Sequence, residues 1–133
     1  MDISTLAAKE SAVLHLRGAD DELLFDNGVP VTVTCFGPGS KAYQKAQATS
    51  QNKLIDRMKR KGNVDQTPDE KLAQQAEFLT ACTESFDGLT SGTFTGPDLF
   101  RAVYSDPEVG FISEQIAKFI GDWSNFTKAS TTA

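Results

Sequence analysis

Few side chains in this chain of 133 residues are of the types that catalyse reactions. His15 is the only histidine, so a Ser-His-Asp arrangement or a histidine-ligated metal site would have to use it. The alternating pattern of residues 11–17 places His15 on one face of a strand with Val13 and Arg17, where a half-exposed histidine is common. We therefore expect no catalysis at His15.

The two cysteines, Cys35 and Cys82, lie far apart in the sequence and form no CxxC pair. This usage is not typical of a disulfide scaffold, and the spacing of His15 and the two cysteines matches no known zinc knuckle or ribbon. We expect both cysteines to be reduced thiols in the core. The sequence predicts no metal and no cofactor.

Residues 37–41, with the sequence GPGSK, form a glycine-rich turn of the kind that can hold phosphate at a helix N-terminus. The P-loop pattern GxxxxGK[ST] and the three-glycine dinucleotide fingerprint are both missing, so a plain strand-to-helix turn is the better interpretation. The acidic pairs Asp20-Asp21 and Asp69-Glu70 fit a solvated turn and the first turn of a helix. No GxSxG, HExxH or EF-hand motif occurs, and the sequence predicts a protein that is not an enzyme.

The sequence predicts strands in the first part of the chain and helices after them. Alternating or apolar runs at residues 11–17, 22–25 and 29–36 predict three strands, and Asn27-Gly28 suits a tight hairpin turn. They predict a small N-terminal antiparallel β meander. Later residues follow helical spacing, in about four helices. Strands followed by helices predict the α+β fold class.

The helices are expected at residues 41–61, at 68–86, after a capping box formed by Thr95 and Asp98, and from the N-cap Asp106 to Phe126. Ser40 and Gly62 suit the two ends of the first helix. That helix has a thin apolar face and should be loosely tied to the core. The last helix has the strongest apolar period, which consists of Ile112, Ile116, Phe119, Ile120 and Trp123.

The chain is long enough for one core, and its composition is that of an ordinary globular domain. We expect a flexible arm at residues 1–10, a single α+β domain at 11–126 and a mobile tail at 127–133, with an internal linker at 62–67. No secretory signal and no apolar run of membrane-spanning length is present. These features predict a cytosolic protein without a membrane partner.

Charge is the most distinctive feature of the sequence. The net charge is -5, yet the stretch 41–61 holds seven of the thirteen Lys and Arg residues and a single Asp. Three interpretations stay open: a solvated surface, a docking surface for an acidic protein segment or neighbouring subunit, and a nucleic-acid surface. The last is disfavoured, because the whole chain is acidic and the stretch contains one aromatic residue, Tyr43. The candidate partner-binding residues are Lys41, Lys45, Lys53, Arg57, Lys59, Arg60 and Lys61, together with Phe111, Trp123 and Phe126 beside the last apolar stripe.

Part of the chain resembles a known family. The segments LHLR at 14–17, ELLF at 22–25, DNG at 26–28, PVTVT at 30–34 and GPGSKAY at 37–43 resemble the start of tail assembly chaperones of tailed bacteriophages. The resemblance covers residues 12–48, and beyond them only size and helical organisation are similar. It implies a β meander that enters a long helix, and the family has no catalytic residues.

The resemblance implies a non-catalytic assembly factor that binds the tape measure protein and assists assembly of the tail tube protein around it. Such a factor is expected in the host cytoplasm, to self-associate, and to be absent from the mature virion. Two other functions remain open. One is a structural tail protein, such as a terminator or connector subunit, and the other is a nucleic-acid-binding module that uses the helix at 41–61.

Overall fold

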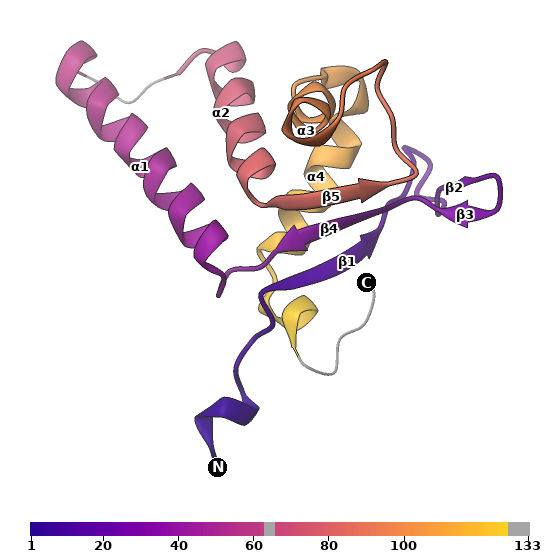
Figure 1. Cartoon of the computed structure of the whole chain (residues 1–133). Helices are drawn as coiled ribbons and strands as arrows, with labels where there is room; N and C mark the ends of the chain where they lie inside the picture. The colour runs from indigo at the N-terminus through magenta and orange to yellow at the C-terminus, as the bar shows by residue number, and fades with distance from the viewer. Residues whose placement is uncertain (63–65, 128–133) are drawn as a thin grey trace.

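A three-stranded antiparallel sheet lies at the centre of the molecule. The computed structural model describes residues 1–62 and 66–127, and Figure 1 shows the arrangement of their elements. The sheet has the order β1 (Ser11–His15), β4 (Thr32–Phe36), β5 (Thr83–Asp87), so its central strand pairs with one early and one late strand. The combination of this sheet with helices on the same chain confirms the expected α+β class.

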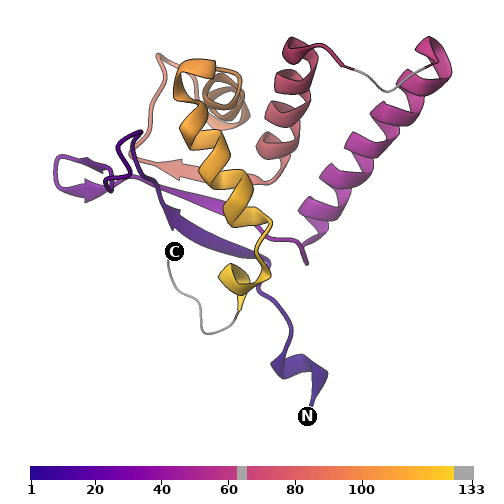
Figure 2. The ribbon, with the colours of Figure 1, turned by 180° about the vertical axis from the view of Figure 1, so that it is seen from behind.

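Strand β4 contributes fully buried side chains to the core. Its side chains alternate as predicted, and Val33 and Cys35 are fully buried while Thr32, Thr34 and Phe36 on the other face are partly exposed. Helix α4 (Gly110–Ile120) crosses the sheet, as Figure 2 shows from behind.

The predicted three-strand meander is wrong in its pairing. Strand β1 pairs directly with β4, and the residues between them form a separate hairpin of β2 (Phe25–Asp26) and β3 (Val29–Pro30) that projects from the sheet. The Asn27-Gly28 turn was predicted correctly, since these residues have φ of 52° and 81°. Direct pairing joins the two most apolar alternating runs, whereas the segment at 20–22 is entirely acidic.

Helix α1 (Lys41–Lys61) has the bounds that the sequence predicts. The Ser40 hydroxyl accepts a hydrogen bond from the Tyr43 N–H at 3.1 Å, and Gly62 ends the helix with φ of 74°. Ala46 is the one residue of this long helix that is buried. Because so little of α1 is apolar, most of its surface remains available to solvent or to a partner.

Helix α2 (Pro68–Ala81) ends five residues before the predicted boundary at Phe86. The residues after Cys82 form β5 instead, because Phe86 pairs with Val33 of β4 and packs its ring against Phe100. These sheet and ring contacts outweigh the helical spacing that Phe86 shares with α2. The predicted helix was therefore wrong beyond Ala81.

The predicted capping box at Thr95 is also wrong. Helix α3 (Gly96–Tyr104) begins with Gly96 at φ of 57°, and the Thr95 side chain makes no capping hydrogen bond. A complete capping box lies instead at the start of α2, where the Thr67 hydroxyl accepts from the Glu70 N–H and the Glu70 carboxylate accepts from the Thr67 N–H.

Helix α4 ends earlier than predicted. Ile112, Ile116, Phe119 and Ile120 are buried as expected, but the helix stops at Ile120 and a separate 3-10 turn follows at Trp123–Phe126. The change of direction leaves Trp123 59% exposed, so its place in the buried stripe was predicted wrongly. Phe126 is fully buried and packs against the Phe119 ring.

The N-terminal arm is tied to the core at its end. The Lys9 N–H donates to the Phe126 carbonyl at 2.6 Å, and the Gly37 N–H donates to the Glu10 carbonyl at 2.8 Å. Earlier in the arm, Met1, Ile3 and Leu6 are exposed. Most of the predicted linker and tail, at 63–65 and 128–133, lies outside the described residues. Within the described residues, no helix combines the length and the apolarity needed to cross a bilayer.

The contact between Gly37 and Phe126 gives a testable prediction. A Cβ atom at Gly37 would lie 2.5 Å from the Phe126 ring, which is fully buried. We expect Gly37→Ala to lower the free energy of unfolding by about 1–3 kcal/mol through overpacking, measured by urea denaturation. Gly110→Ala is the matched control: its Cβ would meet no atom within 4 Å, and its φ of -56° suits alanine. Equal stability of Gly37→Ala and wild type would show that the Phe126 ring does not pack against Gly37.

Candidate functional site

The candidate site is an open groove between α1 and α2. The two helices diverge toward the ends that residues 62–67 connect (Figure 1). Two hollows of about 420 and 310 Å³ lie between them and share the lining residues Lys53, Gln74 and Glu77. We name this feature the α1–α2 groove. The lining residues are Ala42, Lys45, Ala46, Thr49, Ser50, Lys53, Asp56, Arg57, Arg60, Lys61, Gln66, Glu70, Ala73, Gln74, Glu77, Phe78 and Ala81.

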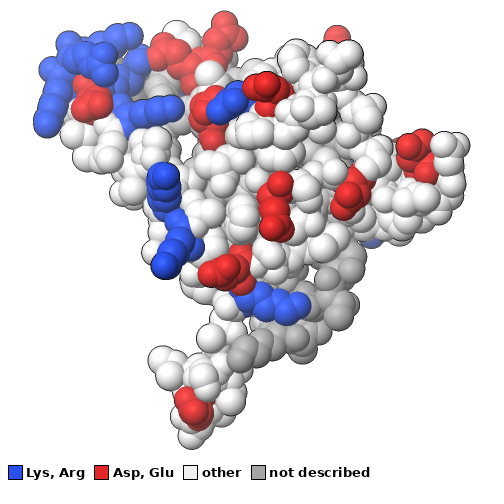
Figure 3. Space-filling view, in the orientation of Figure 1, with Lys and Arg blue, Asp and Glu red and all other residues white. Residues whose placement is uncertain are grey.

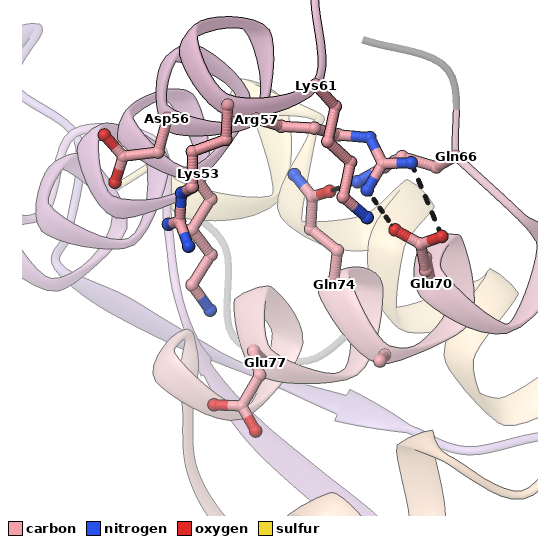
Figure 4. A pocket seen from close by; sticks show the side chains of 10 residues that line it. Lys53, Asp56, Arg57, Lys61, Gln66, Glu70, Gln74 and Glu77 are labelled. Carbon is pink, nitrogen blue, oxygen red and sulfur yellow. Dashed lines mark hydrogen bonds and ion pairs between the residues drawn. The ribbon is translucent and has the colours of Figure 1, made fainter. Parts of the chain in front are cut away.

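Three side-chain contacts connect the two helices across the groove. Tyr43 meets the Phe78 ring edge-on with 5.6 Å between centroids. The Gln74 amide donates to the Ser50 hydroxyl at 2.8 Å. Arg57 binds the Glu70 carboxylate with both terminal nitrogens of its guanidinium group (Figure 4).

These contacts recur at regular spacing. On α1 they fall at every seventh residue, which is about 10.5 Å along a helix, and on α2 at every fourth, which is about 6 Å. The last contact, toward the end where the helices diverge, joins two long side chains, Arg57 and Glu70. Two of the three contacts are polar, so the walls are connected without a continuous apolar interface.

Small side chains line part of the groove. Ala42, Ala46 and Thr49 come from α1, and Ala73 and Ala81 come from α2. Small residues let the backbone of another segment approach closely, as at tightly packed helix pairs. The lining therefore combines small apolar side chains with charged ones.

The predicted basic residues divide into two sets. Five of them, Lys45, Lys53, Arg57, Arg60 and Lys61, line the groove, whereas Lys41 and Lys59 do not. Figure 3 shows Lys and Arg side chains gathered over α1, at the left of the view. Figure 4 shows Lys53 and Lys61 extending from α1 into the space between the helices. The helical spacing of the seven residues could have predicted this division, had the position of α2 been known.

The groove carboxylates on α2 are paired. Glu77 accepts from Arg101 Nε at 3.0 Å, and Glu70 is bound by Arg57. Desolvation opposes ionisation of Glu70, but hydrogen bonds from Thr67 and the Arg57 charge outweigh it and hold the Glu70 pKa below its usual value of 4.5. Both acids are thus neutralised by neighbours within the described part of the chain.

The three predicted aromatic anchors do not gather at one site. Phe111 is half-buried and lines a separate hollow with Arg17 and Lys118. Trp123 is exposed near Gly39, at the base of α1. Phe126 cannot contact a partner because it is fully buried in the core, so its assignment as an anchor is corrected.

The predicted chemical groups are engaged in structural roles. His15 Nε2 lies 2.7 Å from the Leu24 carbonyl, and its ring meets Phe25 edge-on. Burial raises the pKa of Cys35 and of Cys82 to about 12, so both remain protonated thiols at neutral pH. Among residues 1–62 and 66–127, no group of three or more His, Cys, Asp or Glu side chains is placed to hold a metal ion.

Three N–H groups at the glycine-rich turn have partners within the chain. The N–H groups of Gly37, Ser40 and Tyr43 donate to Glu10, to the Gly37 carbonyl and to the Ser40 hydroxyl. These three hydrogen bonds give the turn a structural role. They fix the direction in which α1 leaves the sheet.

Comparisons of this chain with models of protein families, with curated proteins and with solved structures find no match. The groove and the residue pattern of the chain therefore carry the inference of function.

The pairing of Glu70 with Arg57 gives a pH-dependent prediction. Because the Glu70 pKa is lowered in the folded state, its stabilising contribution is complete above pH 4.5 and is lost as the pH falls through the folded-state pKa. We expect Glu70→Gln to be less stable than wild type at pH 7, with a gap that closes under acid conditions. Urea denaturation followed by circular dichroism over this range measures the gap.

Asp56→Asn is the control for this experiment, since Asp56 lines the groove without an ion pair in the described structure. Its stability difference from wild type should be small and should not follow the Glu70 profile. A Glu70→Gln gap that stays constant down to the lowest pH would contradict the assigned role of the carboxylate.

Proposed function

We propose that this protein is a non-catalytic tail assembly chaperone of a tailed bacteriophage, which binds the tape measure protein in the α1–α2 groove. The observation that carries the proposal is the open groove, whose long wall α1 has a single buried residue and a row of basic side chains. The resemblance of residues 12–48 to the start of such chaperones supports the same function.

A groove of this kind fits a long helical partner. At 1.5 Å per residue, the 21 residues of α1 provide a wall about 31 Å long. Laying an amphipathic helix into a groove is a common way to recognise a polypeptide. A tape measure protein offers many helical segments in sequence, so several chaperone copies bound along it gain avidity from modest individual contacts.

The proposal has consequences for location and partners. The chaperone acts in the host cytoplasm, keeps the tape measure protein soluble until tail tube subunits polymerise around it, and leaves before the virion matures. Copies that bind adjacent segments of one tape measure protein are brought together, which favours self-association.

A nucleic-acid-binding function is the second candidate, because one wall of the groove carries Lys45, Lys53 and Arg60, which have no ion pair among the described residues. Two observations weigh against it. Tyr43, the aromatic residue of the basic stretch, is already in contact with Phe78 and is not free to stack on a base. The net charge of the chain is -5, which opposes binding of the polyanionic phosphate backbone.

Co-expression tests the proposed function. We expect the tape measure protein of the same phage to be largely insoluble when produced alone, and soluble and co-purifying when produced with this chain. The reason is that its apolar helical surface is covered by the chaperone. The measurement is the soluble fraction and the co-purified yield, with an unrelated acidic protein of similar size as the control.

Mass spectrometry of purified virions separates the chaperone from a structural tail protein. The chaperone is expected to be missing from the particles. Its presence at a fixed ratio to the tail tube protein, or a tape measure protein that neither gains solubility nor co-purifies, would overturn the proposed function.

A further inference from the structure

We infer that the α1–α2 groove recognises an α-helix that carries a row of carboxylates on one flank, spaced seven or eight residues apart. This inference rests on the proposed function, in which the groove binds a polypeptide, and names the chemistry of the segment that it takes.

The cations on the α1 wall set the spacing. Lys45, Lys53 and Arg60 line the groove and follow one another after eight and seven residues. These steps are about 12 and 10.5 Å along the helix axis. None of the three has a hydrogen bond or ion pair within the part of the chain that the structure describes, so each is available to a partner carboxylate.

The α2 wall does not neutralise these cations. Its two carboxylates, Glu70 and Glu77, are occupied by Arg57 and Arg101. Asp56 is the remaining acid of the lining. Within the described residues, the lining side chains of Lys45, Lys53, Arg60 and Lys61 have no ion pair. The groove therefore presents an excess of positive charge along α1, which an acidic flank would compensate.

The repeat of the cations selects a helix over an extended segment. Seven residues are close to two helical turns, so carboxylates at that spacing stay on one flank of a partner helix that lies along α1. In a strand, a distance of 10.5 Å corresponds to about three residues, and side chains three residues apart point to opposite faces. An extended peptide with carboxylates at this spacing would therefore not place all of them on the side that faces the cations of α1.

The small side chains of the lining determine which face of the partner helix can lie against them. Ala42, Ala46, Ala73 and Ala81 leave room for the helix to approach, and Phe78 offers an apolar surface at the closed end. Alanine and leucine side chains of an incoming helix suit these apolar neighbours, whereas buried polar side chains would lose their hydrogen bonds to water. The occupant is thus an amphipathic helix with a narrow apolar stripe bordered by Asp or Glu.

A synthetic helical peptide tests this inference with the full-length protein. The probe is a fluorescent 21-residue peptide, as long as α1, with an Ala and Leu stripe and Glu at every seventh position beside it. Fluorescence anisotropy measures its dissociation constant. We expect binding by wild type, and a dissociation constant about tenfold higher for the double variant Lys53→Glu/Arg60→Glu, because two attractive pairs become repulsive.

The matched control is Lys41→Glu/Lys59→Glu, which makes the same change in net charge on the same helix but outside the groove lining. It should bind the peptide within about twofold of wild type. The milder variant Lys53→Ala/Arg60→Ala is expected to weaken binding in the same direction. Its thermal unfolding midpoint and circular dichroism spectrum check that the fold is retained.

Three results would overturn the inference. The control variant could lose as much affinity as the groove variant, the peptide with Gln in place of Glu could bind equally well, or a single-stranded DNA of similar length could displace the peptide. If the tape measure protein co-purifies while the acidic peptide fails to bind, the proposed function stands and the acidic-helix inference fails.

Discussion

Helix α1 has too few apolar side chains to be buried, and this constraint determines the rest of the site. With Ala46 as its single buried residue, the helix cannot pack flat on the core. It is held instead by the Ser40 cap at its base and by three side-chain contacts to α2. A helix attached in this way leaves a groove beside it whose walls are charged.

The stability of the fold comes from elements away from that groove. Val33 and Cys35 of β4 are covered by the apolar stripe of α4, and Phe86 of β5 packs on α3. Phe126 closes the opposite end, against Gly37. Because this core does not depend on the outer half of α1, contacts across the groove can be exchanged for contacts to a partner without unfolding the domain.

Local signals in the sequence were sufficient for α1, for its caps and for the hairpin turn, since Ser40, Gly62 and Asn27-Gly28 act through their own backbone neighbours. Features that depend on residues distant in the sequence could not be predicted from local patterns. Strand β5 exists because β4 pairs with it. Trp123 is exposed because α4 stops at Ile120. The basic stretch was visible as composition, but its division into groove and outer residues required the position of α2.

Hydrogen–deuterium exchange of this protein with and without the proposed tape measure partner shows whether a polypeptide occupies the α1–α2 groove. We expect slower exchange in α1 and α2 on binding, with little change in β1 and α4. Slower exchange confined to the β2–β3 hairpin or to the turn at Trp123, with α1 unchanged, would contradict this expectation.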